Sequence, residues 1–472
     1  MHMFLLIIVC LSILSCALSC FSAGVNHVFT LLYLLPLSFG ILSILSWSNI
    51  RKLSKYHSFI IIYLIMIIRY VIAPIGYSIW GKIESRELLN TDLAILIMVY
   101  EQVMVFFVFI VIVNIKLLNI PVHSFLQPVS FNNFSRFYFV FCAVCLMFMP
   151  GLIAKYNFVW NLGDDLNNKV VETDDKAISG VFAILILIGR QLLIFTILSF
   201  LYINALKVRN KRSFVWLSLG LILLSSSIVA ETGRFSILLV NLPLIIVLGI
   251  MYPNHKLKLW TISGVFLVLS IFIVTIYKFY NISYNNTNAL SFISFDPNLL
   301  NAYFSGPFNV SIALDAFDNS MYSLNPGAFF NDNFSSVAFI SHFTNSSLTS
   351  SELFNHRFYG NYDAKDQIIP MIGIGRYHFG LFFSPLYSIV FSFMAFYFEY
   401  MGRKSQNIGF TTVYYSIGIF FASFMMVNSS ILFSSFINGF CFTMVILHLN
   451  EIFSNRKRIY RKPNLWAKLK IS

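Results

Sequence analysis

The sequence predicts an all-α membrane protein with about twelve transmembrane helices and one large loop. Of its 472 residues, 58% are hydrophobic and only 11% are charged, whereas a soluble globular domain carries about 25% charged residues. Apolar runs of roughly 20 residues, the length that crosses a bilayer as a helix, recur along the chain. The alternation of apolar and polar residues that marks a membrane β-barrel is absent.

The apolar runs set the expected order of elements. We expect transmembrane helices near residues 3–22, 28–48, 57–79, 93–115, 134–152, 178–204, 213–230, 234–251, 258–280, 371–400, 408–427 and 431–453. This order divides the chain into helices one to nine (1–280), a large loop (281–370), helices ten to twelve (371–453) and a basic tail (454–472). Residues 1–23 also resemble a secretory signal, but no Lys or Arg precedes the apolar stretch, which favours a retained span.

The net charge of +13 does not indicate nucleic acid as a partner, because the basic residues lie in every second connection. Only Glu399 and Glu451 of the 19 acidic residues fall on that side. The positive-inside rule then places both termini in the cytoplasm and 281–370 outside. On the cytoplasmic side lie 20 of the 32 basic residues: Arg51, Lys52, Lys55, Lys116, Arg136, Lys207, Arg209, Lys211, Arg212, Lys256, Lys258, Arg403, Lys404 and the seven of the tail.

Two outer connections are long. The first, 153–177, is acidic, and the second, 281–370, is rich in Asn, Ser, Phe and Tyr, with short helices expected around 299–318. All six cysteines lie in apolar segments, so we expect neither a disulfide framework nor a thiolate metal site. No phosphate-binding loop, dinucleotide fingerprint or His-Glu-x-x-His motif occurs. We therefore expect no metal and no nucleotide cofactor.

Charged residues inside apolar spans are costly and usually functional. Arg69 and Arg190 lie in the middle of predicted spans, and Glu101 lies well inside another. Arg69 and Glu101 could form a structural pair, or Arg69 could bind an anion. Arg190 has no evident partner in the sequence, which favours an anionic ligand or a water-filled cavity.

Two further segments combine glycine with arginine at the predicted outer surface. In the segment 230–235, Gly233 allows a turn and Arg234 begins the next helix, where a guanidinium is suited to hold phosphate. In the segment 370–380, a proline and several glycines indicate a bent or broken helix that carries Arg376 and His378. For each segment, the alternative is an ordinary turn or helix start with charges at the membrane interface.

Together these cations indicate a lipid pyrophosphate as ligand, since bidentate guanidinium contacts would hold the phosphates. The proposed pyrophosphate ligands are Arg234, Arg190, Arg376, Arg357 and Arg69. The aromatic and amide-rich loop suits a sugar chain. Its candidate contacts, each of which could instead be ordinary loop packing, are Tyr303, Asp315, Asp318, Tyr322, Asn355 and Tyr362.

At these residues the chain resembles the bacterial O-antigen polymerases (Wzy-type), or oligosaccharide repeat-unit polymerases. Three short motifs carry the resemblance: Thr232-Gly233-Arg234, the stretch Tyr303 to Pro307, and the re-entry Pro370 to Gly380. The architecture of the whole chain agrees with that family, whose members are polytopic glycosyltransferases similar to the GT-C class.

The resemblance implies an enzyme of the bacterial inner membrane that works on the periplasmic face. It would transfer a growing glycan from undecaprenyl pyrophosphate to the next lipid-linked repeat unit, in the biosynthesis of lipopolysaccharide or a related surface polysaccharide, without metal or nucleotide sugar. We expect Glu231 or His378 to act as the catalytic base. The lipid-linked oligosaccharide and membrane lipids are the expected partners, and a chain-length regulator protein is a further candidate.

Two other functions stay open at this point. A lipid-linked oligosaccharide flippase would share the span count and the buried arginines, but it has little need of the loop 281–370, and the two similar halves typical of transporters are not evident. An O-antigen ligase would use the same donor with a different acceptor. Sequence separates a ligase from a polymerase poorly.

Overall fold

The computed structural model describes most of the chain, and the regular elements among these residues are helices apart from two three-residue strands. The described residues are 2–23, 29–80, 88–115, 125–148, 156–158, 176–208, 211–230, 234–283, 297–317, 326–338, 340, 343–344, 349–360 and 367–458. They gather in two compact units, each built from distant parts of the chain. Unit 1 comprises 1–120, 291–400 and 417–436, and unit 2 comprises 121–290, 401–416 and 437–472.

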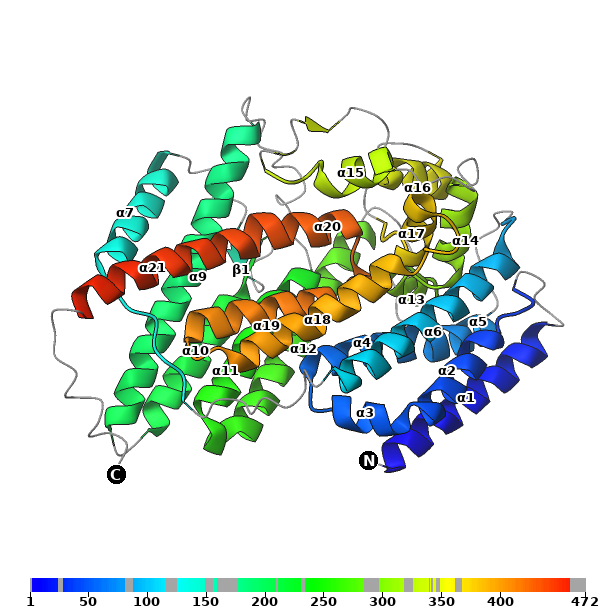
Figure 1. Cartoon of the computed structure of the whole chain (residues 1–472), viewed down its shortest axis with the longest axis horizontal. Coiled ribbons are helices and arrows are strands. Elements are labelled where there is room, and N and C mark those ends of the chain that lie inside the picture. The colour runs from blue at the N-terminus through cyan, green and yellow to red at the C-terminus, as the bar shows by residue number, and fades with distance from the viewer. Residues whose placement is uncertain are drawn as a thin grey trace. The chain divides into compact units, whose positions relative to one another are not determined.

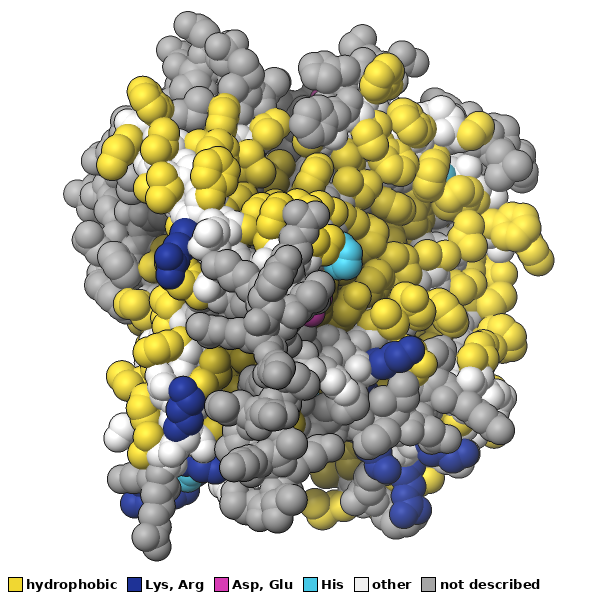
Figure 2. Space-filling model, turned by 60° about the vertical axis from the view of Figure 1, so that its left-hand side comes forward, with side chains coloured by type: hydrophobic (Ala, Val, Ile, Leu, Met, Phe, Trp, Pro, Cys, Tyr) yellow, Lys and Arg dark blue, Asp and Glu magenta, His cyan; other side chains and the backbone are white. Residues whose placement is uncertain are grey.

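Six helices among the described residues are long and apolar enough to cross a bilayer: Met3–Ser22, His57–Ile79, Thr91–Asn114, Val181–Lys207, Pro253–Val274 and Ser429–Ser454. Five shorter apolar helices accompany them. Hydrophobic side chains dominate the described surface on the face that Figure 2 shows, and exposed Phe, Leu and Met are spread over many helices. A water-facing surface rarely exposes so much contiguous apolar area. The fold is therefore that of a helical membrane protein.

Unit 1 is built around α4, α6 and the helices of the large loop. In Figure 1, α13, α14, α16 and α17 cluster beside α5 and α6 of this unit. Its helices are α1 (His2–Ala23), α2 (Leu34–Leu45), α3 (Trp47–Leu53), α4 (His57–Ile67), η1 (Ile68–Ile72), α5 (Ala73–Trp80), α6 (Thr91–Asn114), α13 (Pro297–Phe304), α14 (Pro307–Ala316), α15 (Pro326–Phe334), α16 (Ser350–Tyr359), α17 (Met371–Phe379), η7 (Phe424–Met426) and α20 (Ser429–Ser434).

Unit 2 is a second set of helices with a small sheet. Strand β1 (Tyr156–Phe158) pairs antiparallel with β2 (Ile228–Ala230). Its helices are α7 (Asn133–Phe148), α9 (Lys176–Lys207), α10 (Arg212–Ser227), α11 (Arg234–Met251), η3 (Pro253–His255), α12 (Lys256–Ser283) and α21 (Phe442–Arg458). Three further helices run across the boundary between the two sequence ranges: α18 (Leu386–Lys404), α19 (Ile408–Ala422) and η8 (Ser435–Cys441).

A helix lies at each position where the sequence predicts a span, but several helices differ from the expectation. The expected helix 28–48 is interrupted at Ser46, between α2 and α3. The expected helix 213–230 ends at Ser227, because the next three residues take their hydrogen bonds from β1 instead. The expected helix 371–400 is broken into α17 and α18, as the proline and glycines in its first turns indicate. The helices expected around 299–318 are confirmed as α13 and α14.

The large loop contributes a helix that is part of the core of unit 1. Every residue from Pro307 to Leu314 in α14 is buried, and α14 packs against α6, α16, α17 and α13. A helix that is covered on all sides is a core element. The described helix α14 of the loop is therefore part of the folded core of unit 1.

Two buried carboxylates bind this unit together. Glu101 on α6 pairs with Arg69 in the π-helical segment η1, with 2.9 Å between Oε2 and Nη1 and both side chains fully buried. The structural pair considered from the sequence is thus confirmed. Glu399 on α18 accepts the backbone N–H groups of His57 and Ser58 at 3.0 and 2.7 Å. It supplies the acceptor that the first turn of α4 lacks.

We predict that Glu399→Ala lowers the stability of the protein, because it leaves two buried backbone N–H groups without an acceptor. Each unsatisfied group costs about 1–3 kcal/mol. Glu399→Gln keeps one acceptor oxygen and should lose less. The measurement is the midpoint of thermal unfolding in detergent. Glu451→Ala, which removes a partly exposed carboxylate, is the control, and equal midpoints for the two alanine variants would contradict the assignment.

Candidate functional site

The candidate site is built on α17, the short helix that carries Arg376 and His378. The chain enters it as an extended segment held by two asparagines. Asn428 Oδ1 accepts the N–H of Ile369 at 2.7 Å, and Asn428 Nδ2 donates to the carbonyl of Gln367 at 3.1 Å. Asn309 Nδ2 on α14 donates to the carbonyl of Ile368 at 3.3 Å. These amides fix where α17 begins.

Glycines let α17 pack closely against its neighbours. A Cβ at Gly373 would lie 2.6 Å from the Cβ of Ala313 on α14, and a Cβ at Gly375 would lie 2.0 Å from the carbonyl oxygen of Ser384. Both distances are shorter than a real contact allows. Gly380, with a φ of 77°, then ends the helix. The glycine pattern of 370–380 is thus explained by packing and by a left-handed turn.

His378 is held on both ring nitrogens by residues of the loop and of α18. Its Nε2 lies 2.8 Å from Asp332 Oδ2 on α15, and its Nδ1 lies 2.9 Å from the hydroxyl of Tyr387. Asn333 Nδ2 donates to the same hydroxyl at 2.7 Å. The N–H of Ser350 donates to the other oxygen of Asp332 at 2.8 Å. Because Asp332 only accepts when ionised, Nε2 carries the proton and Nδ1 faces Tyr387 as the acceptor.

Aromatic rings enclose this cluster, which we call the His378 cluster: Asp332, Asn333, His378 and Tyr387. The Phe329 ring meets the imidazole edge to face, with centroids 5.7 Å apart. All four members of the cluster are buried. The apolar surroundings strengthen each of these hydrogen bonds.

The arginines expected in this region have different environments. Arg376 is buried, with 5% of its surface exposed. Arg357 on α16 forms an ion pair of 3.3 Å with Asp315 on α14, and its side chain is 42% exposed. Asp315 also accepts from Leu89 N and Asn90 Nδ2. Asp315 therefore joins α14 and α16 to the segment before α6.

The other residues predicted to bind substrate in unit 1 lie in packing positions or outside the described residues. Asn355 is buried and donates to the carbonyl of Ser351, within its own helix, at 2.7 Å. Tyr303 lies partly buried in α13. Arg69 is buried in its pair with Glu101. Asp318, Tyr322 and Tyr362, expected to contact sugar, lie outside the described residues.

In unit 2, Arg190 on α9 contacts the end of α10. Its Nη2 donates to the carbonyl oxygens of Ser225 and Ile228 at 2.8 and 3.4 Å. The guanidinium thus caps the end of α10, where unpaired carbonyls favour a cation. The sequence did not indicate these partners, and the anionic ligand expected for Arg190 stays a prediction. Arg234 is the first residue of α11, as predicted, and Glu231 lies outside the described residues.

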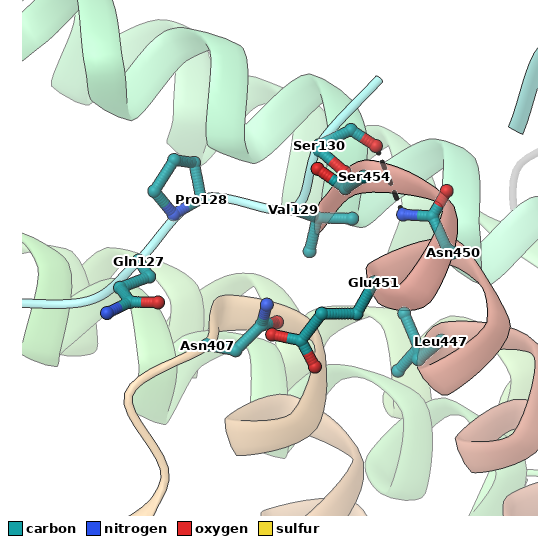
Figure 3. A pocket seen from close by; sticks show the side chains of 9 residues that line it. All are labelled: Gln127, Pro128, Val129, Ser130, Asn407, Leu447, Asn450, Glu451 and Ser454. Carbon is teal, nitrogen blue, oxygen red and sulfur yellow. Dashed lines mark hydrogen bonds between the residues drawn. The ribbon is translucent and has the colours of Figure 1, made fainter. Parts of the chain in front are cut away.

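Unit 2 also contains a small polar hollow (Figure 3). Figure 3 shows the carboxylate of Glu451 and the amide of Asn407 facing one another across it. Asn450 Nδ2 donates to the Ser130 carbonyl at 3.1 Å on one side. The lining residues are Gln127, Pro128, Val129, Ser130, Asn407, Leu447, Asn450, Glu451 and Ser454. No motif in the sequence indicates this hollow.

Sequence reasoning identified His378 but missed the residues that hold it. Asp332 is 46 positions away in the sequence, and no local pattern links the two. The one available signal was the polar triplet Asn331 to Asn333 directly after the apolar residues 328–330. No sequence pattern indicates the roles of Asn309 and Asn428, because asparagine is common in helices and loops.

Chemically, the His378 cluster can receive and hold a proton. Asp332 orients the imidazole and would stabilise it when protonated, and Tyr387 offers a path to Nδ1. Among the described residues, no group of three or more His, Cys, Asp or Glu side chains is placed to share a metal ion. Searches of protein-family models, curated proteins and solved structures found no match to the chain.

We predict that Gly375→Ala displaces α17 and destabilises the protein by about 1–3 kcal/mol, because the new methyl group overlaps a backbone carbonyl that cannot rotate away. Thermal unfolding in detergent measures the loss. Gly264→Ala on α12 is the matched control, since no atom lies within 4 Å of a Cβ there, and it should leave the midpoint unchanged or raise it. A stable Gly375→Ala protein would disprove the packing.

Proposed function

We propose that this chain is a bacterial inner-membrane polymerase of lipid-linked oligosaccharides, similar to the Wzy-type O-antigen polymerases. The observation that carries the proposal is the His378 cluster: a carboxylate from the large loop orients a histidine on a short broken helix, and a buried arginine, Arg376, lies two residues away. A proton acceptor and a fixed cation are what transfer from a lipid diphosphate to a hydroxyl requires.

The proposed reaction is a glycosyl transfer. The acceptor hydroxyl oxygen forms a bond to the anomeric carbon of the growing glycan, while the bond from that carbon to the undecaprenyl diphosphate oxygen breaks. The diphosphate leaves with the bonding electrons. The acceptor hydroxyl gives its proton to the oxygen of Tyr387, displacing the Asn333 amide, as Tyr387 passes its own proton to His378 Nδ1. Glu231 is the alternative base.

Each unit offers arginines to a lipid diphosphate. Arg376 and Arg357 belong to unit 1, and Arg190 and Arg234 belong to unit 2. Arg234 begins a helix, where backbone N–H groups and a guanidinium bind phosphate together. Of the described loop residues, Tyr303 remains a proposed contact to sugar, whereas Asp315 and Asn355 are buried in contacts within unit 1.

The number of spans and their orientation in the membrane are part of this proposal. The proposed topology comprises about twelve spans, cytoplasmic termini and a periplasmic loop 281–370, and it rests on the distribution of Lys and Arg. The shorter apolar helices, such as Asn133–Phe148 and Arg212–Ser227, then count as spans beside the six long helices.

We expect truncated fusions to read out this topology. Alkaline phosphatase fused after residue 283, at the end of α12, should be active, because the fusion point is periplasmic. The same enzyme fused after residue 255, one span earlier, should be inactive there, and green fluorescent protein should fluoresce at 255. The reverse pattern would rule out the orientation.

Arg234→Ala should abolish polymer while leaving the surface lipid with a single repeat unit, because removing one fixed cation from a charge-stabilising site costs roughly 10²–10³ in rate. The measurement is a gel profile of surface polysaccharide from a deletion strain that carries the variant gene. Arg51→Ala, which removes an exposed arginine on the basic side, should give the normal ladder of chain lengths.

The deletion strain itself separates the possible functions. Loss of a polymerase leaves one repeat on the surface lipid, whereas loss of a ligase or a flippase leaves none. A normal ladder from Arg234→Ala, or a deletion strain without the single-repeat product, would refute the proposal.

A further inference from the structure

Two neighbouring residues of α18 engage different polar clusters. The hydroxyl of Tyr387 contacts His378 and Asn333, as described above. The next residue, Ser388, donates from its Oγ to Glu101 Oε1 on α6. Successive residues on a helix point about 100° apart. Both contacts can therefore be made together at one rotation of α18 about its axis.

Glu101 is a rigid partner for Ser388. Its other oxygen is held by Arg69 Nη1 at 2.9 Å and by the hydroxyl of Tyr70 at 3.0 Å. All of these side chains are fully buried. Arg69 and Tyr70 are adjacent in the π-helical segment η1, and such local departures from α-helical geometry are frequent at functional sites. The carboxylate cannot shift without breaking contacts to two helices.

Beyond Ser388, contacts from α6 and α17 also hold the turn before α18. The hydroxyl of Tyr100 donates to the carbonyl of Phe382 at 3.0 Å, and Ser384 contacts Gly375 through its backbone. Ser392, one turn after Ser388, is also buried, and its hydroxyl has no hydrogen-bond partner within the described part of the chain. Ser388 is thus distinguished from its neighbour by the contact to Glu101.

We propose that Glu101 is a positioning residue for His378: held by Arg69, it fixes the rotation of α18 through Ser388 and so presents the Tyr387 hydroxyl to the imidazole. Arg69, expected from the sequence to bind phosphate, then acts as the counter-ion of this anchor. The inference rests on the proposed function for its effect on catalysis. Its structural part, the coupling of Glu101 to the His378 ring, can be measured without any reaction.

The first test uses the full-length protein in lipid bilayers, labelled with ¹⁵N-histidine. The ring nitrogen signals of His378, assigned by their loss in His378→Gln, report the hydrogen bond at Nδ1. Ser388→Ala should move the Nδ1 signal in the same direction as Tyr387→Phe does, and by at least half as much. Ser388→Thr, which keeps the hydroxyl, should restore the signal, and Ser392→Ala should leave it unchanged.

The second test measures chain extension in the deletion strain. Ser388→Ala should lower the rate of extension by about tenfold or more, since small displacements of catalytic groups have effects of this size. In a Tyr387→Phe background the same substitution should add little, because both changes disturb one contact. Ser392→Ala again serves as the control.

The outcomes separate the two proposals. An unmoved His378 signal in Ser388→Ala, or an equal movement in Ser392→Ala, would overturn the positioning role of Glu101. This holds whichever polysaccharide the variant strain produces. A moved signal in a protein whose deletion strain fails to show the single-repeat product would support the coupling and reject the polymerase. If Ser388→Ala does not fold, Ser388→Cys replaces it. Its thiol is a weaker donor of similar size, so the Nδ1 signal of His378 should move in the same direction by a smaller amount.

Discussion

The buried pair of Glu101 and Arg69 is the interaction on which unit 1 depends. A charge inside a membrane protein is costly unless it finds its partner within the protein, and here each charge has one fixed partner at 2.9 Å. The pair joins α6 to η1, and Ser388 extends the join to α18. Glu399 meets the same requirement at the other end of α18 by accepting two amides of α4. These polar contacts therefore fix the helices of unit 1 within a buried apolar core that includes Phe39, Phe106 and Phe109.

The same requirement explains why the large loop is folded. Its backbone must be satisfied where it meets α17, and asparagine is suited to this because one amide can both donate and accept. Asn428 and Asn309 pair with the backbone of 367–369, and Asn301 Oδ1 accepts the first amides of α14 at 3.1 and 3.3 Å. The abundance of asparagine in this loop, which the sequence suggests as a sugar-binding feature, is partly accounted for by these structural bonds.

The sequence predicts the long helices well because a span of apolar residues has few alternatives in a bilayer. The sequence also predicts the pair of Arg69 and Glu101, because each is a charge inside an apolar span. Clustered glycines likewise predict that α17 is part of a broken helix. The contact between Asp332 and His378 was not, since it joins a loop helix to α17 across 46 residues. The strand β2 was missed because Ile228 and Val229 suit a helix end as well as a strand, and the partner β1 alone decides between them.

The burial of the His378 cluster bears on how such a site would work. An imidazole that is hydrogen-bonded at both nitrogens cannot contact a substrate directly. A proton must therefore reach it through Tyr387, or the substrate must displace one of the two hydrogen-bond partners. The Tyr387 oxygen already accepts from Asn333, and an incoming hydroxyl that takes the place of this amide would find the proton path formed. Because the four residues are buried, a site arranged in this way would exclude water until an acceptor arrived. For a reaction that must pass a glycan to a sugar hydroxyl rather than to water, such exclusion has a clear chemical advantage.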